Sequence, residues 1–345
     1  MKPLLLALVL SGAFISCKQY KTEHVERAFY YWKSNGYQFT QMEDSVVKKA
    51  GIHKFYVKYF EVEKNPVMGL VPVAKTNFRF WNRDSTQIIP TVYLRNEVFK
   101  DVRHGELDTL ADNVNFLVRK YSGEGRDYGF KVPLTEYQMD CDWTPGTKDN
   151  YFYFLRKLKA VSGLQISCTL RLYPYKYPAQ MGVPPVDKVT LMCYNLVNPL
   201  ENKEKNSILD IDELSAYLNV NQKYPLHLDI ALPVYSWIQV YRNNHFVKVI
   251  PGNADDFGRV LKPIQKKLWY AVTTDSVADG FYLKAGDKIK VEEITEKQLQ
   301  RAIRIIKQNV ELDSDITVAL FHLDNQQLKH YSNAEISGLY TAFTQ

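Results

Sequence analysis

The sequence contains few cysteines and lacks the spacings that most metal and nucleotide sites need. Four cysteines occur in 345 residues, and no Cys-x-x-Cys pair or Cys/His spacing indicates zinc. Cys141, Cys168 and Cys193 each lie in an apolar, strand-like run, which predicts buried thiols rather than a disulfide framework. No Gly-rich dinucleotide fingerprint, P-loop or Gly-x-Ser-x-Gly elbow occurs. We therefore expect neither a metal nor a cofactor.

A dense block of basic residues is also absent. The chain has 44 Lys+Arg against 38 Asp+Glu, and the formal charge of +6 is small for this length, so we expect no nucleic-acid partner. A hydrophobic share of 46% excludes a wholly disordered chain. Aromatic residues are plentiful, because 24 Tyr, 17 Phe and 5 Trp occur, and they suit either an ordinary core or a sugar-binding cleft.

The one long apolar run lies at the N-terminus. It follows Lys2 and covers residues 3–15, which is shorter than the ~20 residues that span a bilayer and fits a secretory signal peptide over 1–16. The run ends in Phe-Ile-Ser-Cys, which resembles a bacterial lipobox, so Cys17 is the predicted lipidation site. We expect a lipidated tether over 17–27, membrane attachment through Cys17, and a place in the cell envelope on the periplasmic side or outer membrane. The alternative is a plain signal peptide with a chance cysteine.

Strand-like and helix-like segments alternate along the rest of the chain. This alternation predicts an α/β fold with a parallel sheet, and eight units in one domain over 28–345 predict an imperfect (β/α)8 TIM barrel. An open doubly wound sheet is the alternative. The expected strands are 28–33, 54–62, 87–94, 135–143, 165–172, 189–194, 226–232 and 316–323, and the expected helices are 40–50, 104–121, 149–161, 211–218, 296–308 and 332–343.

Three segments depart from an ideal barrel. Residues 63–86 and 173–188 show no helical pattern, and residues 235–294 read as an insertion before the last strand. Turn residues in the insertion predict one hairpin at Asn243-Asn244 and another at Ala285-Gly286-Asp287.

Functional groups of such a barrel lie at the carboxyl ends of its strands. Asp140 and Asp142 are two residues apart on an expected strand, so both carboxylates can point into the mouth, where two close acids raise one pKa. Glu61 is the best further carboxyl, which gives Asp140, Asp142 and Glu61 as candidate catalytic residues. The alternative is a structural ion pair with Lys58 or Arg171.

Other polar and aromatic residues follow the same strand ends. Three tyrosines, Tyr173, Tyr175 and Tyr177, alternate beside prolines and predict an aromatic rim, or else a loop packed over the barrel. No spacing joins His227 and His322 into a metal motif. The candidate substrate-binding residues are Lys58, Trp143, Arg171, Tyr173, Tyr194, Asn195 and Asp229.

Two short motifs resemble the chitinase-like glycoside hydrolases of family eighteen. Residues 139–144 (MDCDWT) are similar to the end of the DxDWE motif, and residues 191–195 (LMCYN) to the later MxYD/N strand. The resemblance implies that Asp142 orients the substrate's acetamido group and that Tyr194 holds it. The family's catalytic Glu is replaced by Thr144, which cannot donate a proton as a carboxylic acid does.

Most of the chain also resembles a group of bacterial barrel lipoproteins of unknown function found in Bacteroidetes. The segments that carry this resemblance are YYWK, KYFEV, MDCDWT, GVPP with LMCYN, and LDIALP with Ser236-Trp237. It implies a glycoside-hydrolase-like barrel and names no reaction.

Two functions follow as hypotheses. The first is a membrane-anchored, glycoside-hydrolase-like barrel that binds a glycan, with hydrolysis of its O-glycosyl bonds left open. The second is a non-catalytic glycan-binding or assembly lipoprotein, which Thr144 favours. A hydrolase for another polar substrate is a weaker third, because fold does not fix function.

Overall fold

The computed structural model describes residues 22–34, 38–76, 86–125, 131–220 and 222–345. The expected signal peptide and residues 17–21 of the expected tether, including Cys17, lie outside the described residues. The first strand, β1 (His24–Tyr31), begins four residues before the expected start at Ala28. Residues 24–27 therefore belong to the folded barrel and not to a polar tether, and their register with the last strand is continuous.

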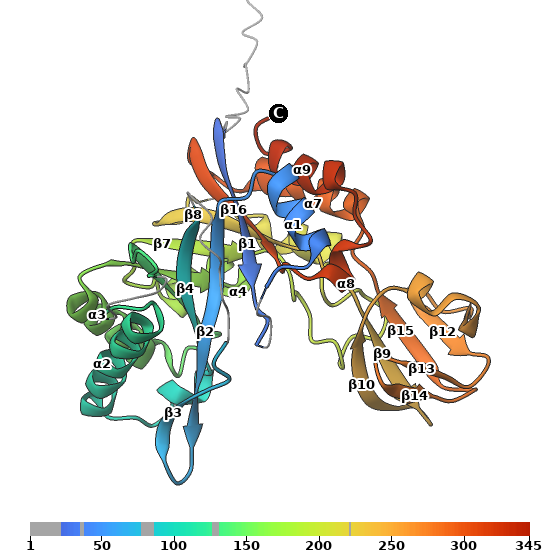
Figure 1. The fold of residues 1–345 in the computed structure, drawn as a ribbon, viewed down its shortest axis with the longest axis horizontal. Coiled ribbons are helices and arrows are strands. Elements are labelled where there is room, and N and C mark those ends of the chain that lie inside the picture. The colour runs from blue at the N-terminus through green and yellow to red at the C-terminus, as the bar shows by residue number, and fades with distance from the viewer. Residues whose placement is uncertain (1–21, 35–37, 77–85, 126–130, 221) are drawn as a thin grey trace, which may run out of the picture.

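Eight parallel strands close into a barrel (Figure 1). The sheet order is β1-β16-β8-β7-β6-β5-β4-β2, and a parallel pairing of β1 with β2 joins the two ends. This closure confirms the predicted TIM barrel and excludes the open doubly wound sheet. The remaining barrel strands are β2 (Lys54–Asn65), β4 (Gln87–Leu94), β5 (Glu136–Asp140), β6 (Gln165–Leu170), β7 (Lys188–Met192), β8 (His227–Pro233) and β16 (Asp315–Phe321).

Helices cover the outside of the barrel because each buries one apolar face. In α7 (Glu296–Asn309), Thr295 caps the first turn, and Leu299, Ile303 and Ile306 are buried at helical spacing. The other helices are α1 (Gln41–Lys49), η1 (Asn96–Phe99), α2 (His104–Tyr121), α3 (Lys148–Ser162), α6 (Ile211–Leu218), α8 (Asn325–Leu328) and α9 (Asn333–Thr341). None of the helices in the described ranges is long and apolar enough to cross a bilayer.

The two crossovers expected to lack helices differ from each other. After β2 the chain forms β3 (Gly69–Val73), an antiparallel hairpin partner of β2, and no helix is present in the described part of 63–86. The expectation for residues 173–188 is wrong, because α4 (Leu172–Lys176) and α5 (Pro178–Met181) lie there. Proline is tolerated in the first turn of a helix, so Pro174 and Pro178 are compatible with these short elements.

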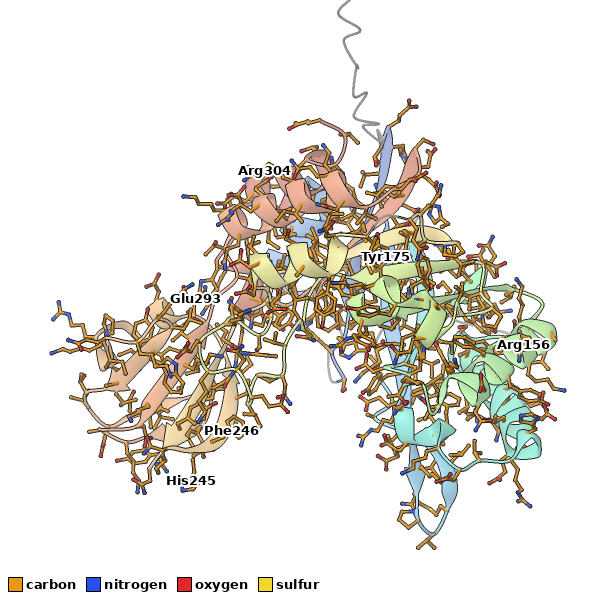
Figure 2. All side chains as sticks on the ribbon, turned by 180° about the vertical axis from the view of Figure 1, so that it is seen from behind. Arg156, Tyr175, His245, Phe246, Glu293 and Arg304 are labelled. Atoms are coloured by element: carbon orange, nitrogen blue, oxygen red, sulfur yellow. The ribbon has the colours of Figure 1, made fainter. Side chains whose placement is uncertain are left out.

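The insertion over 235–294 forms a second, antiparallel sheet of order β10-β9-β15-β12-β11 and a small hairpin β13-β14. It has its own apolar core, which includes Ile238, Val240, Leu283 and Ile289. Figure 2 labels His245 and Phe246 at the far end of this lobe. The elements are β9 (Trp237–Arg242), β10 (His245–Pro251), η2 (Ala254–Val260), β11 (Leu261–Pro263), β12 (Trp269–Val272), β13 (Ser276–Ala278), β14 (Phe281–Leu283) and β15 (Lys288–Glu292).

One of the two predicted hairpins in the insertion is correct. Asn243 and Asn244 join β9 to β10, and both have positive φ (52° and 64°), as a tight hairpin turn requires. The hairpin predicted at Ala285-Gly286-Asp287 is wrong, because β14 pairs with β13 while β15 pairs with β9 and β12. The N–H of Gly286 instead donates to the carbonyl of Val272, which ties this turn to β12.

Candidate functional site

The two predicted acids, Asp140 at the end of β5 and Asp142 two residues after it, lie at the barrel mouth in different surroundings. The hydroxyl of Thr169 on β6 donates to Asp140 Oδ1 over 2.6 Å. Asp142 is more exposed, and its Oδ2 accepts a hydrogen bond of 3.0 Å from Arg171 Nη1. The other arm of that guanidinium donates to the carbonyl of Asn195 over 2.7 Å. Arg171 therefore joins the ends of β5, β6 and β7.

Asp140 holds its proton unusually tightly. Burial of its carboxyl group and the nearby carboxylate of Asp142 raise its pKa from 3.8 to about 7, against the lowering effects of the Thr169 hydrogen bond and the Arg171 charge. Glu61 also contributes to the rise, so its carboxylate lies within electrostatic reach. Near neutral pH, Asp140 is consequently a mixture of the acid and its anion.

Glu61 reaches the same region from β2, but it lies in an ion pair. Its Oε1 is 2.7 Å from Lys58 Nζ, and its Oε2 is 3.8 Å from Arg95 Nη2. The ammonium of Lys58 also lies 5.8 Å from the ring centre of Trp32, which follows β1. The structure thus places Lys58 at the mouth with Glu61 as its partner, and Arg171 with Asp142.

Five aromatic residues at the strand ends contact one another around these charges. We call them the mouth aromatic cluster: Trp32, Tyr194, Tyr235, Trp237 and Phe321. Phe321 is central, since its ring centre is 5.6 Å from those of Trp32 and Tyr235 and 5.4 Å from that of Tyr194. Tyr194 and Tyr235 are buried, whereas Trp32, Trp237 and Phe321 are partly exposed.

A buried carboxylate fixes the orientation of Trp237. Glu292 of β15 accepts hydrogen bonds from the Trp237 indole N–H, from Gln239 Nε2 at 2.9 Å, and from the backbone N–H and hydroxyl of Ser207. The ammonium of Lys290 lies 2.6 Å from its Oε1. Since Ser207 belongs to the loop after β7, Glu292 holds that loop, the insertion and the mouth aromatic cluster together.

Position 144 carries no acid, and its hydroxyl is already engaged. The backbone N–H of Thr144 donates to Thr147 Oγ1 at 2.9 Å, and the two hydroxyls are 3.1 Å apart. The Thr147 hydroxyl donates in turn to Asn96 Oδ1 over 2.6 Å. The last residue of the MDCDWT motif therefore belongs to a turn before α3 that hydroxyl hydrogen bonds stabilise.

Two aromatic residues that the sequence assigned to the barrel mouth are buried away from it. Trp143 is buried against Tyr151 and Phe152, and its indole N–H donates to the carbonyl of Met181 over 3.1 Å. It supports α5 and presents no face to a ligand. Tyr175, labelled in Figure 2, is buried as well and stacks on Tyr224, so the predicted three-tyrosine rim is reduced to its two outer members.

Asp229 lies at the opposite end of the barrel from the mouth. Its carboxylate accepts from the backbone N–H of Thr317 at 2.7 Å and lies 3.2 Å from Lys188 Nζ, which also pairs with Glu136. His227 contacts the same carboxylate. Because Glu136, Lys188 and His227 are the first residues of their strands, the expectation that Asp229 orients a ligand at the mouth is wrong.

Several mouth residues were not assigned from the sequence. Trp32 follows β1, Tyr235 lies two residues after β8, Phe321 ends β16, and Trp237 is the first residue of β9. An aromatic residue at or just after the end of a barrel strand is the signal that would have identified Trp32, Tyr235 and Phe321. In the described ranges, no group of three or more His, Cys, Asp or Glu residues is arranged to hold a metal ion.

The fold and this arrangement define a TIM barrel whose polar and aromatic groups converge where the parallel strands end. It is similar to a chitinase from Chromobacterium violaceum, with a TM-score of 0.55 and 11% identity over 93% of this chain and 99% of that one. It is also similar to the Bacillus cereus spore cortex-lytic enzyme SleL, with a TM-score of 0.52 and 13% identity over 94% of this chain and 75% of that one. An Ostrinia furnacalis Group IV chitinase has a TM-score of 0.50 and 9% identity over 93% of this chain and 99% of that one. No family model and no curated protein matches the sequence. At these identities the likeness shows a chitinase-like barrel fold.

The raised pKa of Asp140 predicts a specific pH dependence of stability. Between about pH 4 and pH 7 the folded state binds this proton and the unfolded state does not, so ionisation of Asp140 costs stability as the pH rises. Asp140→Asn removes that cost, and we expect the variant to gain thermal stability relative to the wild type between pH 5 and pH 8. Thermal unfolding of both proteins at each pH measures it.

A carboxylate with the opposite shift provides the control. Hydrogen bonding from Arg242 lowers the pKa of Asp287, so this carboxylate is ionised in both the folded and the unfolded state above pH 5. The stability difference between Asp287→Asn and the wild type should therefore be the same at pH 5 and pH 8. If the stability difference between Asp140→Asn and the wild type were also the same at pH 5 and pH 8, it would contradict the raised pKa assigned to Asp140.

Proposed function

We propose that this chain is a lipid-anchored protein of the cell envelope whose barrel mouth binds a glycan. The observation that carries the proposal is the mouth aromatic cluster, in which Trp32, Trp237 and Phe321 are partly exposed. The ammonium of the Lys58–Glu61 pair lies 5.8 Å from the ring centre of Trp32, and Tyr235 donates to Asn195, whose carbonyl also accepts from Arg171. Aromatic faces pack on the C–H face of a pyranose, and fixed charged groups bond its hydroxyls.

The similar structures support the same class of ligand. Two of them are chitinases by name, and the third is named as a spore cortex-lytic enzyme. The DxDW-like segment and the Tyr-Asn pair after β7 resemble the corresponding motifs of family eighteen, which supports Asp142 and Tyr194 as residues that contact the sugar. Arg171 and Asn195 complete the polar contacts of this proposed site.

Binding without hydrolysis is the function that the geometry favours. The proton donor of the family-eighteen motif is replaced by Thr144, whose hydroxyl contacts Thr147. Of the nearby carboxylates, Asp142 is paired with Arg171 and Glu61 with Lys58. These pairs suit the recognition of hydroxyl groups, because charged hydrogen bonds are stronger than neutral ones.

Hydrolysis is the second candidate, and Asp140 is the observation that favours it. With a pKa of about 7, its carboxyl group still carries a proton near neutral pH, which general acid catalysis of glycosidic cleavage requires. A second carboxylate, Asp142, lies close enough to raise that pKa. Two acids with different surroundings are the usual arrangement of an acid and its partner in glycosidases.

The anchor is proposed from the sequence of the leader. A basic start, an uncharged apolar run and a small residue before Cys17 together fit a lipoprotein signal. The barrel begins at His24, so six residues, 18–23, would separate the lipidated cysteine from β1. Such a short tether would keep the barrel close to the membrane surface.

A panel of oligosaccharides tests the binding proposal. We expect the wild type to bind at least one member without cleaving it, and Trp237→Ala to weaken that binding by about tenfold, on the order of 1.4 kcal/mol. Isothermal titration measures binding, and mass spectrometry detects cleavage. Phe116→Ala, which removes an exposed aromatic side chain of α2, is the matched control and should bind as the wild type does.

The same panel separates the two candidates. If the wild type cleaves a glycan and Asp140→Asn does not, the function is hydrolysis and not binding alone. Absence of binding to every glycan, or full affinity in Trp237→Ala, would contradict the proposed site.

Restoring the missing acid gives a second test. Thr144→Glu places a carboxyl group where the family-eighteen motif has its catalytic acid, and we expect it to release reducing ends from a bound glycan that carries acetamido groups. Thr144→Gln has the same shape without an exchangeable acid proton and should release none. If Thr144→Glu binds such a glycan but leaves it intact, the replacement at position 144 does not by itself account for the lack of cleavage.

Anchoring is tested on the full chain produced in a bacterial host. We expect the wild type to fractionate with membranes and to incorporate labelled fatty acid, and Cys17→Ala to lose both, because the thiol that would carry the lipid is absent. Equal membrane recovery and equal labelling of the two proteins would contradict lipidation at Cys17.

A further inference from the structure

We propose that Tyr173 and Tyr177 form an outer sugar-stacking subsite, so that the ligand is an oligosaccharide chain rather than a single sugar. The inference rests on the proposed glycan binding at the mouth. We call these two residues the tyrosine platform. They lie on α4 and directly after it, between the end of β6 and α5.

The platform is exposed although the residue between its two members is buried. Tyr173 and Tyr177 are 42% and 41% exposed, whereas Tyr175 is 4% exposed and stacks on Tyr224 with the ring centres 5.8 Å apart. One helical turn therefore uses its central tyrosine to anchor the segment and presents the outer two to solvent.

Neighbouring polar groups hold both rings in place. The Tyr173 hydroxyl donates to Gln180 Oε1 over 3.1 Å. The Lys176 ammonium lies 5.6 Å from the ring centre of Tyr177 and donates to the carbonyl of Ala216 over 2.7 Å. The two tyrosine rings are 4.8 Å apart and inclined by 52°. Binding of a sugar here costs the protein little side-chain entropy, because both tyrosine rings are already held in place.

The platform is close to the proposed site at the mouth. α4 begins directly after Arg171, the residue that binds Asp142. The phenol of Tyr217 on α6 responds electrostatically to Arg171, Tyr173 and Tyr177, so all four groups share one neighbourhood. A glycan that fills the mouth beside Asp142 can therefore extend over the platform without a change in the fold.

The chemistry of the platform fits a pyranose. The two partly exposed rings offer apolar surface, and the hydroxyl of Tyr173, the amide of Gln180 and the ammonium of Lys176 lie next to it. A pyranose has the matching form, with a C–H face and polar edges, whereas a protein partner would need a larger continuous apolar area. The platform is two rings wide, which suits one sugar unit of a longer chain.

Chain-length dependence tests the inference on the full protein. With the glycan identified by the panel, affinity is measured by titration for a series from disaccharide to hexasaccharide. We expect the wild type to bind the longest member at least tenfold more tightly than the disaccharide. The double variant Tyr173→Ala, Tyr177→Ala should lose about tenfold in affinity for the hexasaccharide and keep its affinity for the disaccharide.

Two controls make the result specific. Tyr282→Ala removes an equally exposed tyrosine of the insertion and should leave both affinities unchanged. Unchanged disaccharide binding by the double variant shows that its mouth is intact.

The failures of the two proposals are distinguishable. If the wild type binds no member of the series, the result contradicts both the proposed function and the tyrosine platform. If the wild type binds the series but the double variant binds the hexasaccharide equally well, the proposed function stands and the platform is overturned. A wild-type affinity independent of chain length would also overturn the platform.

Discussion

The buried carboxylate of Glu292 is the interaction on which the arrangement of the mouth depends. It joins the sheet of the insertion, the loop after β7 and the indole of Trp237, and Lys290 balances its charge. A charge in such a place is stable only while every partner is present, and removing one partner of a buried pair costs roughly 3–5 kcal/mol. The insertion is therefore coupled to the barrel by a polar contact that also sets the direction of an aromatic face.

The mouth combines paired charges with partly exposed rings. Asp142 and Glu61 are each paired with a cation, whereas Asp140 is enclosed and remains partly protonated near neutral pH. Under the proposed function, the paired charges and the rings would bind the sugar, and Asp140 is the separate group that could transfer a proton.

The barrel could be predicted from periodicity, but the direction of single side chains was harder to predict. Asp140 and Asp142 point into the mouth as strand alternation requires, and the same rule places Trp143 with Cys141 on the buried outer face. Asp229 was misplaced because strand membership alone does not show which end of a strand a residue occupies. The pairing of β15 with β9 joins segments more than 40 residues apart in the chain, which local turn signals cannot reveal.

The charged cluster of Glu136, Lys188 and Asp229 has a consequence for how a polymer would be held. It lies inside the barrel near the amino ends of the strands, and TIM-barrel interiors are packed with side chains and do not form a pore. A glycan chain at the mouth would lie across the strand ends with both of its termini outside the protein. Such a surface could attach to the middle of a long polymer as readily as to its end.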